Sequence, residues 1–134
     1  MKFSKKLKWV TITLGYVLVI FLLSFRNPGT GSYSLVKEIL TNSAHLPLYG
    51  VLGYFILVML KHFRFKGLLP VYAIAIGMSV AVADESFQSF VPGRHIDPMD
   101  LILDLIGICL SMVVFNIVRA KIKKQKKQIV LGET

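Results

Sequence analysis

The sequence predicts an all-α membrane protein, a four-helix transmembrane bundle with both termini in the cytoplasm. Three observations lead to this class. Hydrophobic residues make up 54% of the 134-residue chain, and the mean hydropathy is +0.65. Four apolar stretches are each long enough to cross a bilayer as a helix. The basic residues gather at the two chain ends and in one central loop, a pattern typical of the cytoplasmic segments of membrane proteins.

The four apolar stretches cover about residues 9–25, 44–60, 68–83 and 101–118. Each lies near the lower end of the ~17–25 residues that span hydrocarbon. They are too long and too uniformly apolar for barrel strands, so helices with internal backbone hydrogen bonds are expected. The first stretch follows a basic start, as in a signal peptide. It ends at Phe25-Arg26 without a small-residue cleavage site, which favours a retained anchor.

The distribution of basic residues predicts the orientation of the chain. Thirteen Lys and Arg residues precede the first stretch, separate the second from the third, or follow the fourth, whereas three lie on the other side. The positive-inside rule therefore predicts a multi-pass protein of the cell membrane with both termini and the central loop in the cytoplasm. Residues 1–118 are expected to form the membrane domain. Residues 119–134 are expected to be a basic cytoplasmic tail, either disordered or lying on anionic lipid headgroups.

Local signals predict where two helices begin and how the third one packs. Pro70 suits the first turn of the third helix, and Asp97-Pro98 would supply the N-cap and the first position of the fourth. Small residues recur every four positions on two faces of the third helix. This spacing favours close packing within one monomer, with dimerisation as the weaker alternative. The two faces carry Ala73, Gly77 and Ala81, and Ala75, Ser79 and Ala83.

Several kinds of partner are disfavoured. The basic side chains lie neither on an amphipathic face nor among stacking aromatics, so no nucleic acid is expected as a partner. The single cysteine, Cys109, cannot form an intrachain disulfide and has no second thiol for a metal site. We therefore expect no cofactor and no metal ion, and the sequence gives no oligomeric state.

Acidic and polar residues between the third and fourth helices predict a polar pocket at the outer face of the membrane. If the third helix continues beyond its apolar run, Asp84 and Gln88 share one face, and Glu85 lies three residues before Gln88. Pro92-Gly93 suits the centre of a tight turn, which would send the chain back into the fourth helix. Arg94 follows that turn and would lie among the carboxylates.

The fourth helix carries a polar stripe at successive spacings of four, three and four residues, which one helical face accommodates. Its members are Asp100, Asp104, Gly107 and Ser111. Asp104 would cost about 2.5–3.5 kcal/mol if it faced lipid, so we expect it to face the bundle interior or a wet cavity. On the second helix, His45, Tyr49 and Gly53 recur every four residues, starting from the same outer end.

Each of these residues also has a purely structural explanation. Asp97 and Asp100 can cap the fourth helix, and the acids of the third can be solvated at its end. Arg94 can neutralise neighbouring acids, and a single histidine such as His45 is more often a hydrogen-bond partner than a ligand. The convergence of all these groups on one depth of the membrane favours a functional pocket over a structural network.

These residues resemble the VanZ-like family of bacterial membrane proteins. That family has a histidine near the outer start of one span, then an acidic pair with a glutamine, a Pro-Gly-Arg turn, and an aspartate and a glycine in the next span. The matching residues, within residues 42–107, are His45, Asp84, Glu85, Gln88, Pro92, Gly93, Arg94, Asp100, Asp104 and Gly107. Asp104 stands where the family commonly has Asn, so this position of the fourth helix is more acidic.

The resemblance implies a role at the bacterial cell envelope, since the family's namesake is associated with low-level resistance to the glycopeptide teicoplanin. The first hypothesis is a non-catalytic protein among membrane lipids whose pocket binds a lipid headgroup, a cell-wall precursor or a lipoglycopeptide, with Arg94 meeting an anionic group. The alternative is a membrane enzyme acting on a lipid-linked phosphate. In it Asp84 or Glu85 would be the general base, His45 an acid or base, and Asp104 a metal or proton partner, and carboxylates with one histidine could hold a divalent cation. A transporter or channel subunit with Asp104 in an ion path ranks last.

Overall fold

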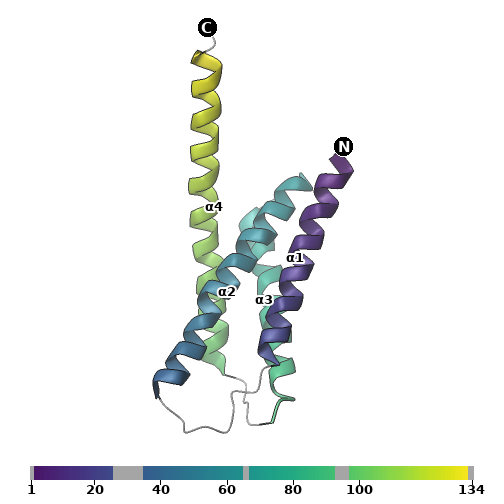
Figure 1. The fold of residues 1–134 in the computed structure, drawn as a ribbon, viewed down its shortest axis with the longest axis vertical. Coiled ribbons are helices and arrows are strands. Elements are labelled where there is room, and N and C mark those ends of the chain that lie inside the picture. The colour runs from purple at the N-terminus through teal and green to yellow at the C-terminus, as the bar shows by residue number, and fades with distance from the viewer. Residues whose placement is uncertain (1, 26–34, 65–66, 93–96, 133–134) are drawn as a thin grey trace.

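The structure is a computed structural model. It describes residues 2–25, 35–64, 67–92 and 97–132, with side chains over 5–25, 43–64, 67–92 and 97–130. Within these ranges the chain forms four α-helices and no strands (Figure 1): α1 (Lys2–Ser24), α2 (Leu35–His62), α3 (Leu69–Gln88) and α4 (Pro98–Gly132). All four are long and apolar enough to span a membrane, which confirms the predicted fold class. The start of α1 and the end of α4 lie at the same end of the bundle (Figure 1), as an even number of spans requires.

The second helix organises the bundle. α2 packs against each of the other helices, whereas α1 contacts α2 and α3 but not α4 within the described residues. On α1 the buried residues are Thr13 and Ile20, which lie seven positions apart and therefore on one helical face. The hydroxyl of Tyr16 donates a hydrogen bond of 3.2 Å to the backbone carbonyl of Leu48 and so ties α1 to α2.

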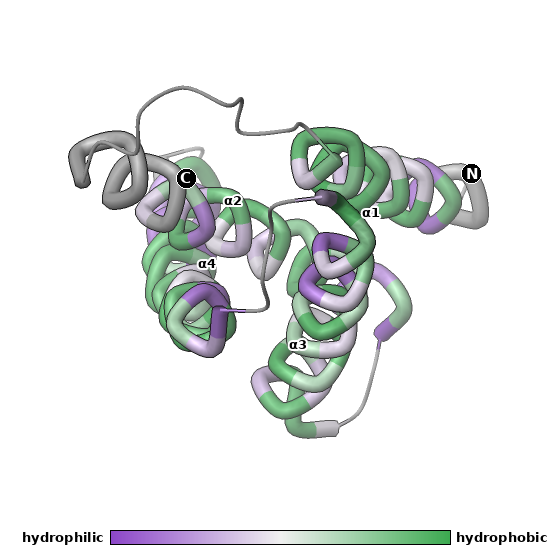
Figure 2. Tube along the Cα trace, turned by 90° about the horizontal axis from the view of Figure 1, so that it is seen from below, coloured by the Kyte–Doolittle hydropathy of each residue, from purple (hydrophilic) through white to green (hydrophobic). Residues whose placement is uncertain are grey.

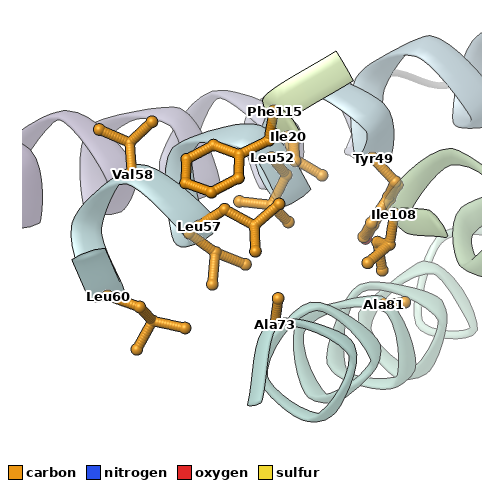
Figure 3. Packing of buried hydrophobic residues seen from close by; sticks show 11 residues of the cluster. Ile20, Tyr49, Leu52, Leu57, Val58, Leu60, Ala73, Ala81, Ile108 and Phe115 are labelled. Atoms are coloured by element: carbon orange, nitrogen blue, oxygen red, sulfur yellow. The ribbon is translucent and has the colours of Figure 1, made fainter. Parts of the chain in front are cut away.

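The core is a narrow apolar seam between the helices (Figure 3). Leu52 and Leu57 of α2 lie close to Phe115 of α4, and Tyr49 lies beside Ile108. Outside this seam the helices expose large apolar side chains, for example Leu14, Leu18 and Leu22 of α1 and Val113, Val114 and Ile117 of α4. Figure 2 shows hydrophobic residues along most of each helix, with hydrophilic ones concentrated toward the helix ends. Water-soluble monomers rarely expose so much apolar surface, whereas lipid tails favour it.

Glycines allow α2 and α4 to pack at close range. A Cβ added to Gly107 would overlap the backbone carbonyl oxygen of Leu46 and would lie 2.9 Å from the backbone nitrogen of Gly50. A Cβ added to Gly53 would lie 3.1 Å from the Cα of Ile108. At Gly107 the obstacles are backbone atoms, so no rotamer change can relieve the overlap and only glycine fits.

The small residues of α3 pack on one of the two predicted faces. Ala73, Gly77 and Ala81 are all buried, and a Cβ added to Gly77 would lie 2.6 Å from Cδ1 of Ile108 on α4. The expected packing within one monomer is therefore confirmed for this face. On the other face, Ala75 and Ser79 are exposed.

The helix ends agree with the proline signals, but the tail differs from expectation. Pro70 is the second residue of α3, and Pro98 is the first of α4. Helix α4 continues without a break to Gly132, so residues 119–132 are helical and not disordered, whereas contact of the tail with lipid headgroups stays a prediction. Its 35 residues correspond to roughly 52 Å, about 20 Å more than the hydrocarbon core requires. Figure 1 shows this helix extending beyond the rest of the bundle.

Cationic side chains from three helices meet at the end of the bundle where α1 begins. The ammonium of Lys6 lies 5.3 Å from the ring centroid of Phe63. Lys61 and Arg119 both approach the ring of Phe115, at 5.9 Å and 5.5 Å. Such contacts are cation–π interactions. They place basic side chains of α1, α2 and α4 at one end, as the charge pattern predicts, whereas the side of the membrane that this end faces stays a prediction.

Candidate functional site

Polar side chains gather at the opposite end, where α3 ends, α4 begins and both pack against α2. Six of the seven predicted site residues have buried side chains here: His45, Asp84, Glu85, Gln88, Asp100 and Asp104. They meet because α3 continues as a helix to Gln88, and α4 returns from Pro98. The seventh, Arg94, and Gly93 of the predicted turn lie outside the described residues.

The start of α4 is held by an N-cap. Oδ1 of Asp97 accepts a hydrogen bond of 2.9 Å from the backbone N–H of Met99, the second residue of the helix. The backbone N–H of Asp97 donates to Oε2 of Glu85 at 3.3 Å, which fixes the beginning of α4 against the end of α3. Capping therefore accounts for Asp97. It does not account for Asp100, whose side chain turns inward toward His45.

Three acids surround the imidazole of His45. Nδ1 of His45 lies 3.0 Å from Oδ1 of Asp104, and Nε2 lies 3.6 Å from Oδ2 of Asp100. Glu85 also offers a carboxylate oxygen that lies within 4.8 Å of ligand atoms of both His45 and Asp100. We call these four residues the His45 cluster. It joins α2, α3 and α4 around one buried ring, with an acid at each ring nitrogen.

A second network surrounds Asp84. Oδ2 of Asp84 accepts hydrogen bonds from the hydroxyl of Ser24 at 2.9 Å, the amide of Gln88 at 3.1 Å and the hydroxyl of Tyr49 at 3.4 Å. The Gln88 bond confirms the predicted i, i+4 pairing on α3. We call these four residues the Asp84 network. It links α1, α2 and α3 through neutral donors that converge on one oxygen, which is the pattern of a structural tie.

The predicted pocket is thus divided into two adjoining parts. Their rings are in contact, since Tyr49 of the Asp84 network stacks parallel to His45, with centroids 6.1 Å apart and an interplanar angle of 4°. Asp84 and Glu85 are neighbours in the sequence, but Asp84 belongs to the Asp84 network and Glu85 to the His45 cluster. The predicted stripe on α4 faces inward throughout: Asp100, Asp104, Gly107 and Ser111 are all buried.

Two participants were not among the predicted site residues. Tyr49 had been placed only on the same face as His45, and Ser24 had not been singled out. Ser24 lies 60 residues from Asp84 in the chain. The sequence nonetheless contains a signal, because Ser24 is the one hydroxyl residue in the second half of the first apolar stretch.

The site is rich in acceptors and poor in donors. It contains four carboxyl groups and one imidazole, and the ion pairs found among the described side chains are the two made by His45. Three buried carboxylate oxygens there have no described hydrogen-bond partner: Oδ1 of Asp84, Oε1 of Glu85 and Oδ2 of Asp104. Each such atom costs about 1–3 kcal/mol. The arrangement therefore suits a bound cation or a ligand that donates hydrogen bonds.

An apolar groove runs along the seam of α2 and α4 beside this site. Its volume is about 390 Å³, within the range of ligand pockets. Gly50 and Gly107, where α2 and α4 approach each other closely, are among the residues that line the groove. One end is lined by Leu46, the residue after His45, and Gly107 follows Asp104 by less than one turn. Apolar and polar surfaces thus adjoin at the same depth of the bundle.

Four membrane-spanning helices with a buried polar site at one end define a multi-pass membrane protein. The model of the family described as VanZ/LLP1 matches residues 3–119, which include all four spans and every predicted site residue. The chain therefore belongs to the VanZ/LLP1 family, and the resemblance seen in its motifs is confirmed. No curated protein and no solved structure matches the chain.

Proposed function

We propose that this VanZ-like protein binds the polar head of an amphiphile at the outer face of the bacterial cell membrane. The ligand is a membrane lipid, a lipid-linked cell-wall precursor or a lipoglycopeptide of the teicoplanin type. The observation that carries the proposal is the junction of the acceptor-rich His45 cluster with the apolar groove between α2 and α4. An amphiphile has two parts that match these features: a polar head suits the His45 cluster, and a long apolar chain suits the groove.

The chemistry of the site favours a head that donates hydrogen bonds. The partnerless oxygens of Glu85 and Asp104 are acceptors, so hydroxyl, amide or ammonium groups of a sugar, peptide or ethanolamine head would satisfy them. Binding would also exclude water from carboxylates that already lie at membrane depth, which strengthens their electrostatic interactions. A captured antibiotic or precursor would change glycopeptide susceptibility without any chemical reaction.

The test pairs a phenotype with direct detection of the ligand. A bacterial host lacking the gene would carry the parent chain, Glu85→Gln or Ser86→Ala. Ser86 is the matched control, because it neighbours Glu85 but is exposed and bonds only to the carbonyl of Val82. We expect the parent and Ser86→Ala to raise teicoplanin tolerance and to retain an amphiphile in native mass spectrometry, and Glu85→Gln to do neither. Unchanged susceptibility together with no retained amphiphile would refute the proposal.

A second candidate is a membrane enzyme acting on a lipid-linked phosphate. The observation that favours it is the imidazole of His45, which one carboxylate orients at 3.0 Å while its other nitrogen stays near Asp100. An oriented imidazole is the usual general acid or base. Turnover of a polyprenyl phosphate by the purified parent, lost in His45→Gln but kept in Ser86→Ala, would establish this activity, and absence of turnover in the parent would remove it.

A further inference from the structure

Three possible metal ligands, one from each of three helices, converge inside the His45 cluster. His45 of α2, Glu85 of α3 and Asp100 of α4 are all buried, and each offers one atom such that the three atoms lie within 4.8 Å of one another. Nε2 of His45 and Oδ2 of Asp100 are 3.6 Å apart. A cation with bonds of about 2.0–2.2 Å holds its ligands roughly 3.3–3.5 Å apart in a tetrahedral arrangement. The His45–Asp100 pair is already near this separation, and a carboxylate oxygen of Glu85 lies within 4.8 Å of both ligand atoms.

The fourth residue of the cluster orients the imidazole for such a role. Nδ1 of His45 lies 3.0 Å from Oδ1 of Asp104. An ionised carboxylate can only accept, so the neutral ring carries its proton on Nδ1 and keeps the lone pair of Nε2 free on the side of Asp100 and Glu85. Metal-binding histidines usually donate their second ring N–H to a carboxylate in this way.

Unsatisfied charge provides an independent reason for a cation. Glu85 is 2% exposed and Asp104 is 1% exposed, yet Oε1 of Glu85 and Oδ2 of Asp104 have no described hydrogen-bond partner. Among the side chains that the structure describes, no Lys or Arg forms an ion pair with Glu85 or Asp104. Buried carboxylates at membrane depth are stable only when they are paired, protonated or bound to a metal. A divalent cation would compensate two of these charges at once.

We propose that His45 Nε2 and the carboxylates of Glu85 and Asp100 bind a divalent cation, with Asp104 as the positioning residue for His45. The imidazole ligand favours Zn²⁺ or Mn²⁺ over Mg²⁺ and Ca²⁺, which prefer oxygen ligands alone. Three protein ligands leave at least one coordination position for water or an incoming group. This site does not depend on the proposed amphiphile, since the cation is held by the chain alone. The sequence contains no metal-binding motif, and a divalent cation belongs there only to the enzyme alternative, without a defined set of ligands.

The experiment measures metal binding by the full-length protein in detergent. After removal of any affinity tag and exposure to EDTA, the protein is titrated with ZnCl₂ or MnCl₂, and bound metal is counted by mass spectrometry of the elements after gel filtration. Thermal unfolding is recorded in parallel. We expect one ion per chain and a higher unfolding temperature with Zn²⁺ or Mn²⁺, and no comparable effect of MgCl₂ or CaCl₂. A response to Mg²⁺ or Ca²⁺ alone would refute the proposed ligand set.

Variants separate the site from binding elsewhere. Glu85→Gln and Asp100→Asn should lose the ion, and Asp104→Asn should weaken binding by about 10–100-fold, the usual effect of an orienting partner. Ser86→Ala is the control, because Ser86 neighbours Glu85 on α3 but is exposed and its hydroxyl bonds to the carbonyl of Val82, and it should keep the ion. A parent protein that gains neither metal nor thermal stability would overturn the proposal, and so would equal binding by the parent and both ligand variants.

Discussion

Replacing Gly107 by alanine tests whether the close approach of α2 and α4 holds the bundle together. The new Cβ would overlap the carbonyl oxygen of Leu46 and lie 2.9 Å from the nitrogen of Gly50. Both obstacles are backbone atoms, so the helices must separate. Overpacking of this kind costs about 1–3 kcal/mol, against an intrinsic helix preference for alanine of about 0.8–1.0 kcal/mol. We therefore expect a net loss of up to about 2 kcal/mol.

Gly15→Ala is the matched control for this substitution. Gly15 is exposed on α1, and a Cβ there would have nothing within 4 Å. The intrinsic helix preference is common to both variants, so the difference between them isolates the packing cost of about 1–3 kcal/mol.

The assay is reversible unfolding in mixed micelles by titration with sodium dodecyl sulfate, followed by circular dichroism. If Gly107→Ala and Gly15→Ala agree within about 0.5 kcal/mol, the range of ordinary surface substitutions, the reasoning about this seam is wrong.

Three further predictions address the cap, the Asp84 network and the orientation. Asp97→Ala should lower the free energy of unfolding by about 0.5–2 kcal/mol through loss of the cap, whereas Asp97→Asn should keep most of it; equal stability of the two would contradict the cap assignment. Gln88→Leu removes an amide donor from Asp84 and should cost about 1–3 kcal/mol in the same micelle assay, and an unaltered unfolding curve would show that the bond contributes nothing. In a Cys109→Ser background, a membrane-impermeant maleimide should label Ser89→Cys on intact cells and Lys124→Cys only after permeabilisation. The reverse labelling pattern would invert the predicted topology.

Much of the fold could be predicted because the bilayer constrains it strongly. Span length, apolar runs and the prolines at positions 70 and 98 were sufficient to give four helices and two of their starting points. The expectation of a disordered tail is wrong, because the helix propensity of residues 119–131 outweighs their polar composition. Residues 119–131 contain neither Gly nor Pro and are rich in Lys, Arg and Gln, which are good helix formers. A helix already formed in the membrane can continue through such a segment without new nucleation.

Helical spacing predicted which site residues share a face of one helix, but not which residues meet between helices. Intervals of four residues correctly paired Asp84 with Gln88 and turned the α4 stripe inward. They could not show which acid faces which donor across helices, because that depends on the relative depth of helices joined by loops. The bond from Ser24 to Asp84 and the separation of Asp84 from Glu85 both arise from that tertiary register.

The length of α4 has an electrostatic consequence. Arg119 still packs on Phe115, beside Lys61 of α2. Lys127 is eight residues further along the same unbroken helix, or about 12 Å along the axis. This exceeds the screening length of about 8 Å in physiological salt. If α4 stands upright in the bilayer with Arg119 at the level of the headgroups, its outermost lysines lie beyond the screened reach of lipid headgroup charge, where they would attract soluble anions instead.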